Sequence, residues 1–284
     1  MIELEGVSFA YRTGEADVVP ALRGLDSRIE PGQFVAIIGH NGSGKSTLVK
    51  LLTAVLYPDE GEIRIDGIPV REENQWEIRE RVAVVFQDPD DQLIMNRVAD
   101  DVAFGPENLG LPREEISGRV EFALRALGLE GIGGRLIEDL SPGQKQRVAI
   151  AGALAMRPHF LILDEPTSLL PTPVAGRLIS TIKDMGRREG MGVLHITHSM
   201  SEAALFERVI VMDEGRIVMD ETPAEVFRRV DELRQVGLDV PLAASIAHRL
   251  RSRGVPLEGD ILNEEDLRHA ISALKSPRAK APGP

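Results

Sequence analysis

Short apolar runs bounded by glycine and proline recur along the chain and alternate with segments of helical periodicity. Runs of four or five apolar residues predict strands that are buried on both faces. Such strands, separated by helices, indicate a mostly parallel sheet covered by helices on both sides, so we predict an α/β fold. The predicted strands are residues 34–38, 82–86, 160–163, 192–196 and 209–212, and the predicted helices are residues 46–56, 116–127, 144–156 and 174–185.

The two ends of the chain depart from this pattern. Residues 2–29 indicate antiparallel strands with a Gly-rich turn, which form an N-terminal β subdomain. Composition shifts near Thr222, and two short amphipathic helices are predicted beyond it. One predicted apolar face contains Leu242, Ile246 and Leu250, and the other contains Leu267, Ala270, Ile271 and Leu274.

These patterns predict three parts. A main domain is expected over residues 1–225 and a small helical appendage over residues 226–275. The remaining residues, 276–284, are Pro-rich and basic, which predicts a disordered tail.

Composition narrows the function classes. The 284 residues include 33 basic and 45 acidic side chains, and the net charge of −12 argues against a general affinity for nucleic acid or anionic lipid. Without cysteine the chain can form neither a disulfide nor a thiolate metal site. No apolar run approaches the roughly 18 residues that cross a bilayer, and the N-terminus lacks a signal-peptide pattern. We therefore expect a cytoplasmic chain that reaches a membrane only through a partner.

A phosphate-binding loop is the clearest chemical motif. Glycines let backbone N–H groups turn inward around phosphate oxygens, and the following helix adds the positive end of its dipole. The lysine of this motif reaches the β- and γ-phosphates, and its serine hydroxyl binds Mg²⁺. Alone, a Gly-rich turn between strand and helix is ordinary, but a chance match to the whole pattern has a probability of roughly 1 in 100. The motif consists of Gly39, His40, Asn41, Gly42, Ser43, Gly44, Lys45 and Ser46, followed by Thr47.

Two carboxylates follow a second apolar strand. Residues 160–163 end in Asp164 and Glu165, where α/β folds place their chemistry. Asp164 is suited to hold Mg²⁺ through water, and Glu165 to polarise an attacking water. Alone, an apolar strand that ends in Asp-Glu is common, and only the phosphate loop makes the catalytic interpretation the stronger one.

Further segments resemble the ABC-type ATPases, and the resemblance covers about the first four-fifths of the chain. The run from Leu140 to Arg147 is similar to the ABC signature and lies between the two phosphate motifs. Gln87 resembles the Q-loop glutamine, His198 the switch histidine, and Tyr11 the aromatic that stacks on adenine. Singly, each of these residues is more often an ordinary core or surface position, so their shared order carries the resemblance.

The resemblance implies an ATP-hydrolysing P-loop fold with a helical signature subdomain at about residues 88–158. It implies that Glu165, His198 and Gln87 act in catalysis and that Ser46, Gln87 and Asp164 hold Mg²⁺. The family works as a head-to-tail dimer with two ATP molecules between the subunits. Residues 39–47 and Tyr11 of one subunit would then bind ATP together with the partner's signature residues, which here are Ser141, Gly143 and Gln144.

Two prolines depart from the family pattern. Pro142 replaces the first glycine of the usual signature, and we expect it at the first helical position after a Ser141 cap, where it stiffens the signature without abolishing it. Pro171 stands where the family usually has an aspartate that contacts the partner. A proline supplies neither a carboxylate nor an N–H, so we expect weaker communication across the dimer and unequal ATP sites.

The strip from Val85 to Gln92 resembles the Q-loop of energy-coupling factor (ECF) transporter ATPases, as do residues 144–152 and 237–242. This resemblance implies a second ATPase subunit, identical or paralogous, a transmembrane scaffold, and a small membrane protein that captures a vitamin or a transition-metal ion. The chain would then lie at the cytoplasmic side of the cell membrane.

Acidic residues beside the Q-loop are expected to receive the scaffold near Gln87 to Asp91, and Asp100, Asp101 and Glu107 to extend an acidic groove. Without the resemblance, a solvated acidic loop is the simpler interpretation. The C-terminal helices are expected to pair with those of the second ATPase, although a self-packed cap fits the same apolar stripes.

Other functions use the same motifs. The chain is acidic and lacks the coiled-coil insertion or tandem ATPase units of soluble ABC ATPases that act on DNA or ribosomes, so no nucleic-acid partner is expected. An ATPase of a conventional ABC importer or exporter, or an ATP binder without turnover, is also compatible with the core motifs.

Overall fold

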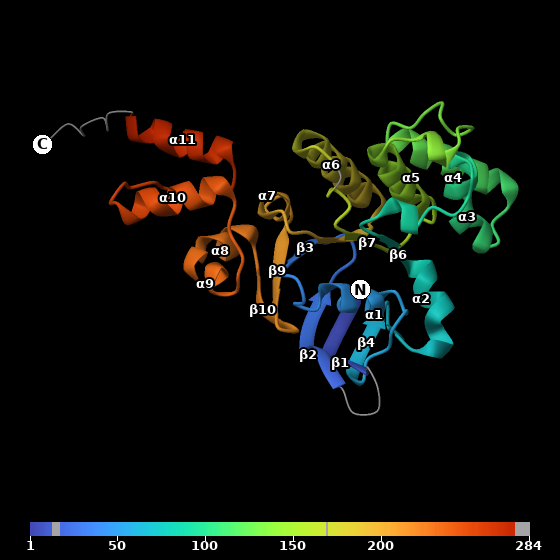
Figure 1. The fold of residues 1–284 in the computed structure, drawn as a ribbon, viewed down its shortest axis with the longest axis horizontal. Helices are drawn as coiled ribbons and strands as arrows, with labels where there is room; N and C mark the ends of the chain where they lie inside the picture. The colour runs from blue at the N-terminus through green and yellow to red at the C-terminus, as the bar shows by residue number, and fades with distance from the viewer. Residues whose placement is uncertain (13–17, 169, 276–284) are drawn as a thin grey trace, which may run out of the picture.

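Two β-sheets form the framework of the chain in the computed structural model, which describes residues 1–12, 18–168 and 170–275 (Figure 1). The smaller sheet is antiparallel, in the order β2 (Val18–Ile29), β1 (Ile2–Arg12), β4 (Glu60–Ile65) and β5 (Ile68–Pro69). The larger has the order β10 (Arg216–Glu221), β9 (Arg208–Asp213), β3 (Phe34–Ile38), β8 (Gly192–Ile196), β7 (Phe160–Asp164) and β6 (Val82–Val85). All its neighbouring strands pair in parallel except β10 with β9, which are antiparallel.

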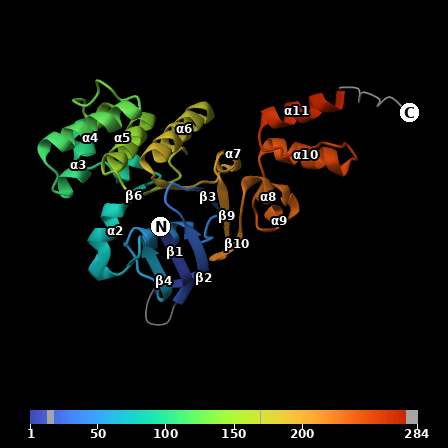
Figure 2. The ribbon, with the colours of Figure 1, turned by 180° about the vertical axis from the view of Figure 1, so that it is seen from behind.

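A helical unit lies between β6 and β7 in the sequence and occupies one end of the molecule (Figures 1 and 2). It contains α3 (Val98–Asn108), α4 (Arg113–Ala126) and α5 (Pro142–Ala155), together with 3-10 turns at Pro89–Asp91 and Ile137–Asp139. Arg119 of α4 donates to the carbonyls of Ala155 and Met156, which satisfies acceptors at the end of α5. Buried residues of all three helices belong to one apolar core, so the unit is anchored on the sheet.

Alternate residues of β3 enter two different cores, because successive side chains of a strand point to opposite faces. Phe34, Ala36 and Ile38 join the core shared with the helical unit and α6 (Thr172–Glu189). Val35 and Ile37 join the core shared with the antiparallel sheet and α1 (Lys45–Leu52). Two further short helices are α2 (Gln75–Arg81) and α7 (Met200–Ala203). The central sheet is therefore covered on both faces, as predicted.

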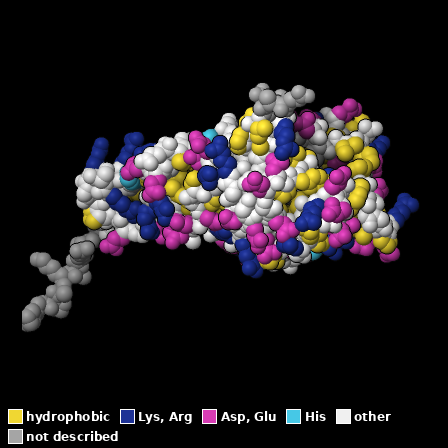
Figure 3. All heavy atoms as spheres, turned by 90° about the horizontal axis from the view of Figure 1, so that it is seen from below, with side chains coloured by type: hydrophobic (Ala, Val, Ile, Leu, Met, Phe, Trp, Pro, Cys, Tyr) yellow, Lys and Arg dark blue, Asp and Glu magenta, His cyan; other side chains and the backbone are white. Residues whose placement is uncertain are grey.

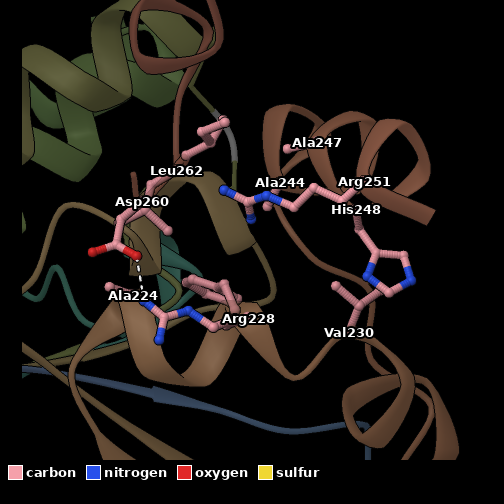
Figure 4. A pocket seen from close by; sticks show the side chains of 11 residues that line it. Ala224, Arg228, Val230, Ala244, Ala247, His248, Arg251, Asp260 and Leu262 are labelled. Carbon is pink, nitrogen blue, oxygen red and sulfur yellow. Dashed lines mark hydrogen bonds and ion pairs between the residues drawn. The ribbon is translucent and has the colours of Figure 1, made fainter. Parts of the chain in front are cut away.

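The C-terminal helices lie at the end of the molecule opposite the helical unit (Figure 1). They are α8 (Pro223–Arg228), α9 (Val230–Gln235), α10 (Leu242–Ser252) and α11 (Glu264–Lys275). The predicted division near residue 225 falls within α8, whose Val226 and Phe227 belong to the main core. A pocket of about 120 Å³ separates α8 from α10, and Arg228 closes one side by donating to Asp260 at 2.5 Å (Figure 4).

The α/β fold class is confirmed, and several local predictions are wrong. The first helix ends at Leu52 instead of residue 56, because Ala54 takes a left-handed backbone with φ of 51°. The strand predicted to reach residue 86 ends at Val85. In α10 the alanines Ala243, Ala244 and Ala247 face the core, whereas Leu242 is 68% exposed and Ile246 is 37% exposed. The disordered tail predicted at residues 276–284 lies outside the described residues.

Acidic and basic side chains are interspersed on the face shown in Figure 3. Within the part of the chain that the structure describes, no helix is both long enough and apolar enough to cross a membrane.

Candidate functional site

The glycines of the loop between β3 and α1 are required by its geometry. A Cβ on Gly39 would lie 2.4 Å from the Met212 carbonyl oxygen, closer than any real contact. Gly44 has φ of 104°, and its Cβ would lie 2.8 Å from the Ala21 carbonyl oxygen. Such backbone conformations and close approaches are open only to glycine. The loop therefore wraps tightly at the carboxyl end of β3, with backbone amides free to turn toward an anion.

Lys45 lies inside this loop with only 7% of its surface exposed. Its Nζ donates to the carbonyl oxygens of Gly39 at 2.7 Å and His40 at 3.0 Å. Burial lowers the pKa of Lys45 from its ordinary value, against the opposing effect of Glu165 and Asp164. The ammonium is thus held at the loop by carbonyls, in a position to exchange them for phosphate oxygens.

His40 ties the same loop to the end of β9. Its Nδ1 lies 2.7 Å from the Asn41 carbonyl oxygen, and its Nε2 lies 2.7 Å from Oδ1 of Asp213. Both partners only accept hydrogen bonds, so both ring nitrogens donate and the imidazolium form is favoured. The bonds to Asn41 and Asp213 raise the pKa of His40 above its ordinary value, although burial and Lys45 oppose them.

Tyr11 and Thr47 flank the start of α1. The two hydroxyls are hydrogen-bonded at 3.2 Å, and Nζ of Lys50 lies 5.9 Å from the centre of the Tyr11 ring. Phe9 packs edge-on against Tyr11 with ring centres 5.1 Å apart. The predicted aromatic therefore lies beside the phosphate loop, as stacking on a bound base requires. Ser46, at the first turn of α1, is exposed.

Asp164, Glu165 and His198 meet at the carboxyl ends of β7 and β8. Asp164 ends β7 and pairs in register with Ile196, the last residue of β8. Glu165 has φ of 50°, and its N–H donates to the Ile196 carbonyl at 3.0 Å. Its Oε1 lies 2.7 Å from Nε2 of His198. The structure therefore brings these three predicted residues together.

The environment of Asp164 differs from that of an ordinary surface carboxylate. Burial and the neighbouring Glu165 raise the pKa of Asp164 above its ordinary value, while Lys45 and His198 act in the opposite direction. The site thus combines a buried cation, a half-buried carboxylate and a partly exposed carboxylate–histidine pair, as expected for a site that binds a charged ligand.

Gln87 follows the strand that neighbours β7, where Val85 pairs with Leu163. It follows β6 by two residues and its side chain is exposed. Among the described residues, no hydrogen bond joins it to Asp164 or Glu165. The adjoining backbone is fixed instead by Gln92, which accepts from the Phe86 N–H at 3.0 Å, and by Gln146, which donates to the Phe86 carbonyl at 3.3 Å.

Ser141, Gly143 and Gln144 begin α5 as predicted. Ser141 is the N-cap, Pro142 is the first helical residue, and Gln144 completes a capping box. The Ser141 N–H donates to Oε1 of Gln144 at 3.0 Å. In the described ranges, no hydrogen bond links this helix start to residues 39–47.

A second polar cluster, missed by sequence reasoning, lies beneath the carboxylate–histidine pair. Glu202 of α7 accepts hydrogen bonds from Thr167 and Thr197, and His195 of β8 contacts the same carboxylate. The sequence Ser-x-x-Glu at residues 199–202 reads as an ordinary capping box, which conceals this arrangement. Asp213, the partner of His40, was also missed, because nothing local to either residue indicates the contact.

A phosphate loop at the end of β3, next to a paired carboxylate and histidine and in one chain with a capped signature helix, defines an ATP-hydrolysing cassette. Residues 22–168 match the ABC transporter family. The chain is 50% identical over 280 residues to the energy-coupling factor transporter ATP-binding protein EcfA1 of Symbiobacterium thermophilum, covering 97% of this chain and 98% of that protein. It is 47% identical over 268 residues to EcfA1 of Caldanaerobacter subterraneus subsp. tengcongensis, covering 94% and 97%.

Solved structures of ATP-binding cassettes have a similar fold. The cbiO1 protein of Clostridium perfringens, described as part of the ABC transporter complex cbiONQ, aligns with a TM-score of 0.74 and 36% identity over 87% of this chain and 98% of that one. A dimeric ATP-binding cassette bound to ADP and Pi after hydrolysis aligns with a TM-score of 0.71 and 30% identity over 78% and 99%. This chain belongs to the family of ABC transporter ATPases that includes the energy-coupling factor ATP-binding proteins.

Proposed function

We propose that the chain binds and hydrolyses ATP as a subunit of an ECF-type importer. The convergence of Lys45, Asp164 and the Glu165–His198 pair at the ends of β3, β7 and β8 carries this proposal. In it, ATP-driven closing and opening of a dimer is coupled to uptake of a vitamin or transition-metal ion through membrane partners.

ATP binding is assigned to two elements. Tyr11 stacks on the adenine, and its bond to Thr47 keeps the ring beside α1. Residues 39–47 surround the phosphates, and Lys45 exchanges its carbonyl partners for the β- and γ-phosphate oxygens. His40 supports the loop through Asp213 and adds positive charge near the phosphates.

The oxygen donors near the loop suit Mg²⁺, which takes one or two protein ligands together with phosphates and water. Ser46 offers a hydroxyl, Asp164 a carboxylate and Gln87 an amide oxygen. The described residues contain no group of three or more His, Asp or Glu side chains that would hold a metal by themselves, so the triphosphate must supply further ligands. When bound, Mg²⁺ neutralises charge that develops on the phosphates.

Hydrolysis is assigned to Glu165 and His198. Glu165 is placed at a strand end beside Lys45 and is suited to orient and polarise the attacking water. His198 lies 2.7 Å from Glu165 and is suited to hold the γ-phosphate and the carboxylate in one arrangement. Gln87, which follows the strand next to β7, would add its amide to this group.

The signature requires a second ATPase subunit, identical or paralogous. Ser141, Gly143 and Gln144 surround the N-terminus of α5, where a helix favours an anion. In the proposed dimer, the γ-phosphate that they meet is held by the phosphate loop of the partner. The two subunits then hold two ATP molecules between them, and hydrolysis loosens the dimer.

A transmembrane scaffold is proposed to dock near Gln87 to Asp91. A groove of about 280 Å³ opens there, with a mainly apolar lining that includes Phe86, Phe104 and Met156. Phe86 is 41% exposed and Ile94 is 67% exposed, which favours an apolar partner helix. This chain then lies at the cytoplasmic side of the cell membrane and contacts the substrate-capture subunit only indirectly.

Two acidic residues of the predicted groove have partners within the chain. Asp90 already pairs with Lys145 at 2.6 Å, and Asp101 accepts from the N–H groups of Ile94 and Met95 at 2.8 and 2.9 Å. These carboxylates therefore hold the segments around the groove in place. In the proposal, a docked partner contacts mainly the apolar lining of the groove, and the charged side chains lie at its edge.

The substitution Glu165→Gln tests the proposal. It keeps the shape of the side chain but removes the base, so ATP hydrolysis should fall by about 10²-fold or more, while ATP-dependent dimerisation persists. Phosphate release and light scattering with ATP measure the two properties. Glu121→Gln, on the exposed face of α4, is the matched control. Undiminished phosphate release from the Glu165→Gln protein, or a wild type that neither dimerises nor hydrolyses ATP, would contradict the proposal.

A further inference from the structure

The carboxylate of Glu202 lies at the centre of a buried polar cluster beneath the proposed site. Thr167 donates to both of its oxygens, at 2.9 and 2.8 Å, and Thr197 donates to Oε2 at 3.1 Å. Nε2 of His195 lies 2.9 Å from the same oxygen and must carry the proton, because a carboxylate only accepts. The segment after β7 and the end of β8 therefore meet on one side chain.

These partners are almost completely removed from solvent. The exposed fraction is 6% for Thr167, 3% for Thr197 and 0% for His195. Burial acts to raise the pKa of Glu202, but the hydrogen bonds from His195 and the two threonines outweigh it, and the pKa lies below its ordinary value. The charged carboxylate is thus kept in a largely buried position, where its hydrogen bonds are stronger than they would be in water.

Glu202 does not complete the capping box that its position three residues after Ser199 predicts. Ser199 caps α7 and accepts from the Glu202 N–H at 3.3 Å, which is the first half of a capping box. In a complete box the glutamate would return the bond to the Ser199 N–H. Here that N–H donates to the Thr197 hydroxyl at 3.0 Å, and the Glu202 carboxylate is free for Thr167 and His195.

The segments joined by Glu202 are those that carry the two central residues of the site. Thr167 follows Glu165 by two residues, and Thr197 immediately precedes His198. His195 belongs to β8 and stacks on Phe206 with ring centres 4.9 Å apart, so its position is fixed by the core. Its Nδ1 is buried and has no hydrogen-bond partner among the residues that the structure describes, which leaves Glu202 as its polar contact there. The carboxylate therefore connects both loops to a rigid strand.

We propose that Glu202 is a positioning residue, which sets the distance between Glu165 and His198 by holding their two loops on one carboxylate. This inference rests on the proposed ATP hydrolysis and assigns a part in it to a residue that does not touch the nucleotide. Misplacement of reacting groups by about 1 Å can cost 10²-fold in rate without affecting binding. The phosphate loop makes none of the contacts to Glu202 described above, so ATP affinity should be independent of this residue.

The test uses Glu202→Gln and Thr167→Val in the full chain within its assembled transporter. An amide cannot accept from three donors in the same way, and valine removes the hydroxyl at nearly unchanged volume. We expect kcat to fall about 10- to 100-fold in both variants, with the Kd for ATP changed less than about threefold. Thr167→Ser keeps the donor and should retain most of the activity.

A double substitution separates positioning from general destabilisation. If Glu202 acts through the Glu165–His198 pair, Glu202→Gln should change the residual rate of a His198→Ala protein by less than about twofold. Glu207→Gln, at an exposed pair with Arg187 on the following segment, is the matched control and should hydrolyse ATP normally. If Glu202→Gln fails to fold, as judged by its melting curve, Thr167→Val and Thr167→Ser decide the question.

Two results would overturn the inference: wild-type kcat in Glu202→Gln or Thr167→Val, or an undiminished effect of Glu202→Gln in the His198→Ala protein. In either case the wild type still hydrolyses ATP. Failure of the proposed function is distinguishable, because then the wild-type transporter itself releases no phosphate.

Discussion

At the scale of single residues, His40 shows how a phosphate loop is held in place before any phosphate arrives. Its ring bridges the Asn41 carbonyl and Asp213, two acceptors from segments far apart in the sequence. Lys45 is held from the other side by the carbonyls of Gly39 and His40. The loop is thus fixed by two of its own side chains, and His40 also ties it to the end of β9.

His40→Gln should have an effect that depends on pH. Because the folded state raises the pKa of His40 above 6.5, its contribution to stability is present below that value and disappears as the pH rises through the folded pKa. Melting curves without nucleotide should show a larger loss of Tm at about pH 5.5 than at about pH 8.5. The difference should be only about 1–3 °C, since the side chain is 38% exposed.

The exposed His269 of α11 provides the control for a histidine substitution, and His269→Gln is measured at the same two pH values. An equal loss of Tm for His40→Gln at both pH values would mean that the imidazolium does not hold the loop.

At the scale of secondary-structure elements, the start of α5 shows how a signature helix accommodates a proline. Ser141 caps the helix, Gln144 returns a bond to the Ser141 N–H, and Pro142 occupies the position whose N–H would have no intrahelical acceptor. The N–H groups of Gly143 and Gln144 remain in place. The unusual residue therefore restricts the backbone without removing a donor from the signature.

Pro142→Gly should change stability more than activity. Glycine enlarges the conformational freedom of the unfolded chain, so the free energy of unfolding should decrease by roughly 0.5–1 kcal/mol. The ATPase rate should stay within about twofold, because the capping box and the signature N–H groups are unchanged. Urea unfolding and steady-state phosphate release measure the two effects. A large rise in rate on Pro142→Gly would show instead that the proline restrains the signature.

The same scale shows what the sequence could and could not predict. The five buried parallel strands were predicted because their apolar runs are continuous, and with them came the ends that carry Asp164 and His198. The strand β10 and the helices α8 and α9 were not predicted, since short or half-exposed elements have weak periodicity. Glu202 was hidden by a local capping pattern, and only the tertiary approach of Thr167 reveals its use.

At the scale of the whole molecule, the surface proposed to hold the second subunit includes two regions. The nucleotide site lies at the carboxyl ends of the central strands, and the C-terminal helices lie at the end of the molecule away from the helical unit (Figure 1). In α10, small alanines face the core and leave Leu242 and Ile246 exposed. A self-packed cap would bury these larger side chains, so their exposure favours pairing with a second copy or a paralogue.

Leu242→Asp combined with Ile246→Asp should therefore weaken the nucleotide-free dimer. A charged side chain is costly to remove from water when two apolar surfaces come together. We therefore expect the dimer Kd to rise by about tenfold or more, which corresponds to a loss of at least about 1.4 kcal/mol in the free energy of association. The ATP-bound dimer should be less affected, because the two nucleotides hold it through the phosphate loops and signatures. Sedimentation with and without ATP measures both. Val218→Asp, at another exposed apolar position that is 43% accessible, is the control. If the double variant associates as tightly as the wild type without ATP, α10 is only a cap, and the subunits are joined through nucleotide and membrane partners alone.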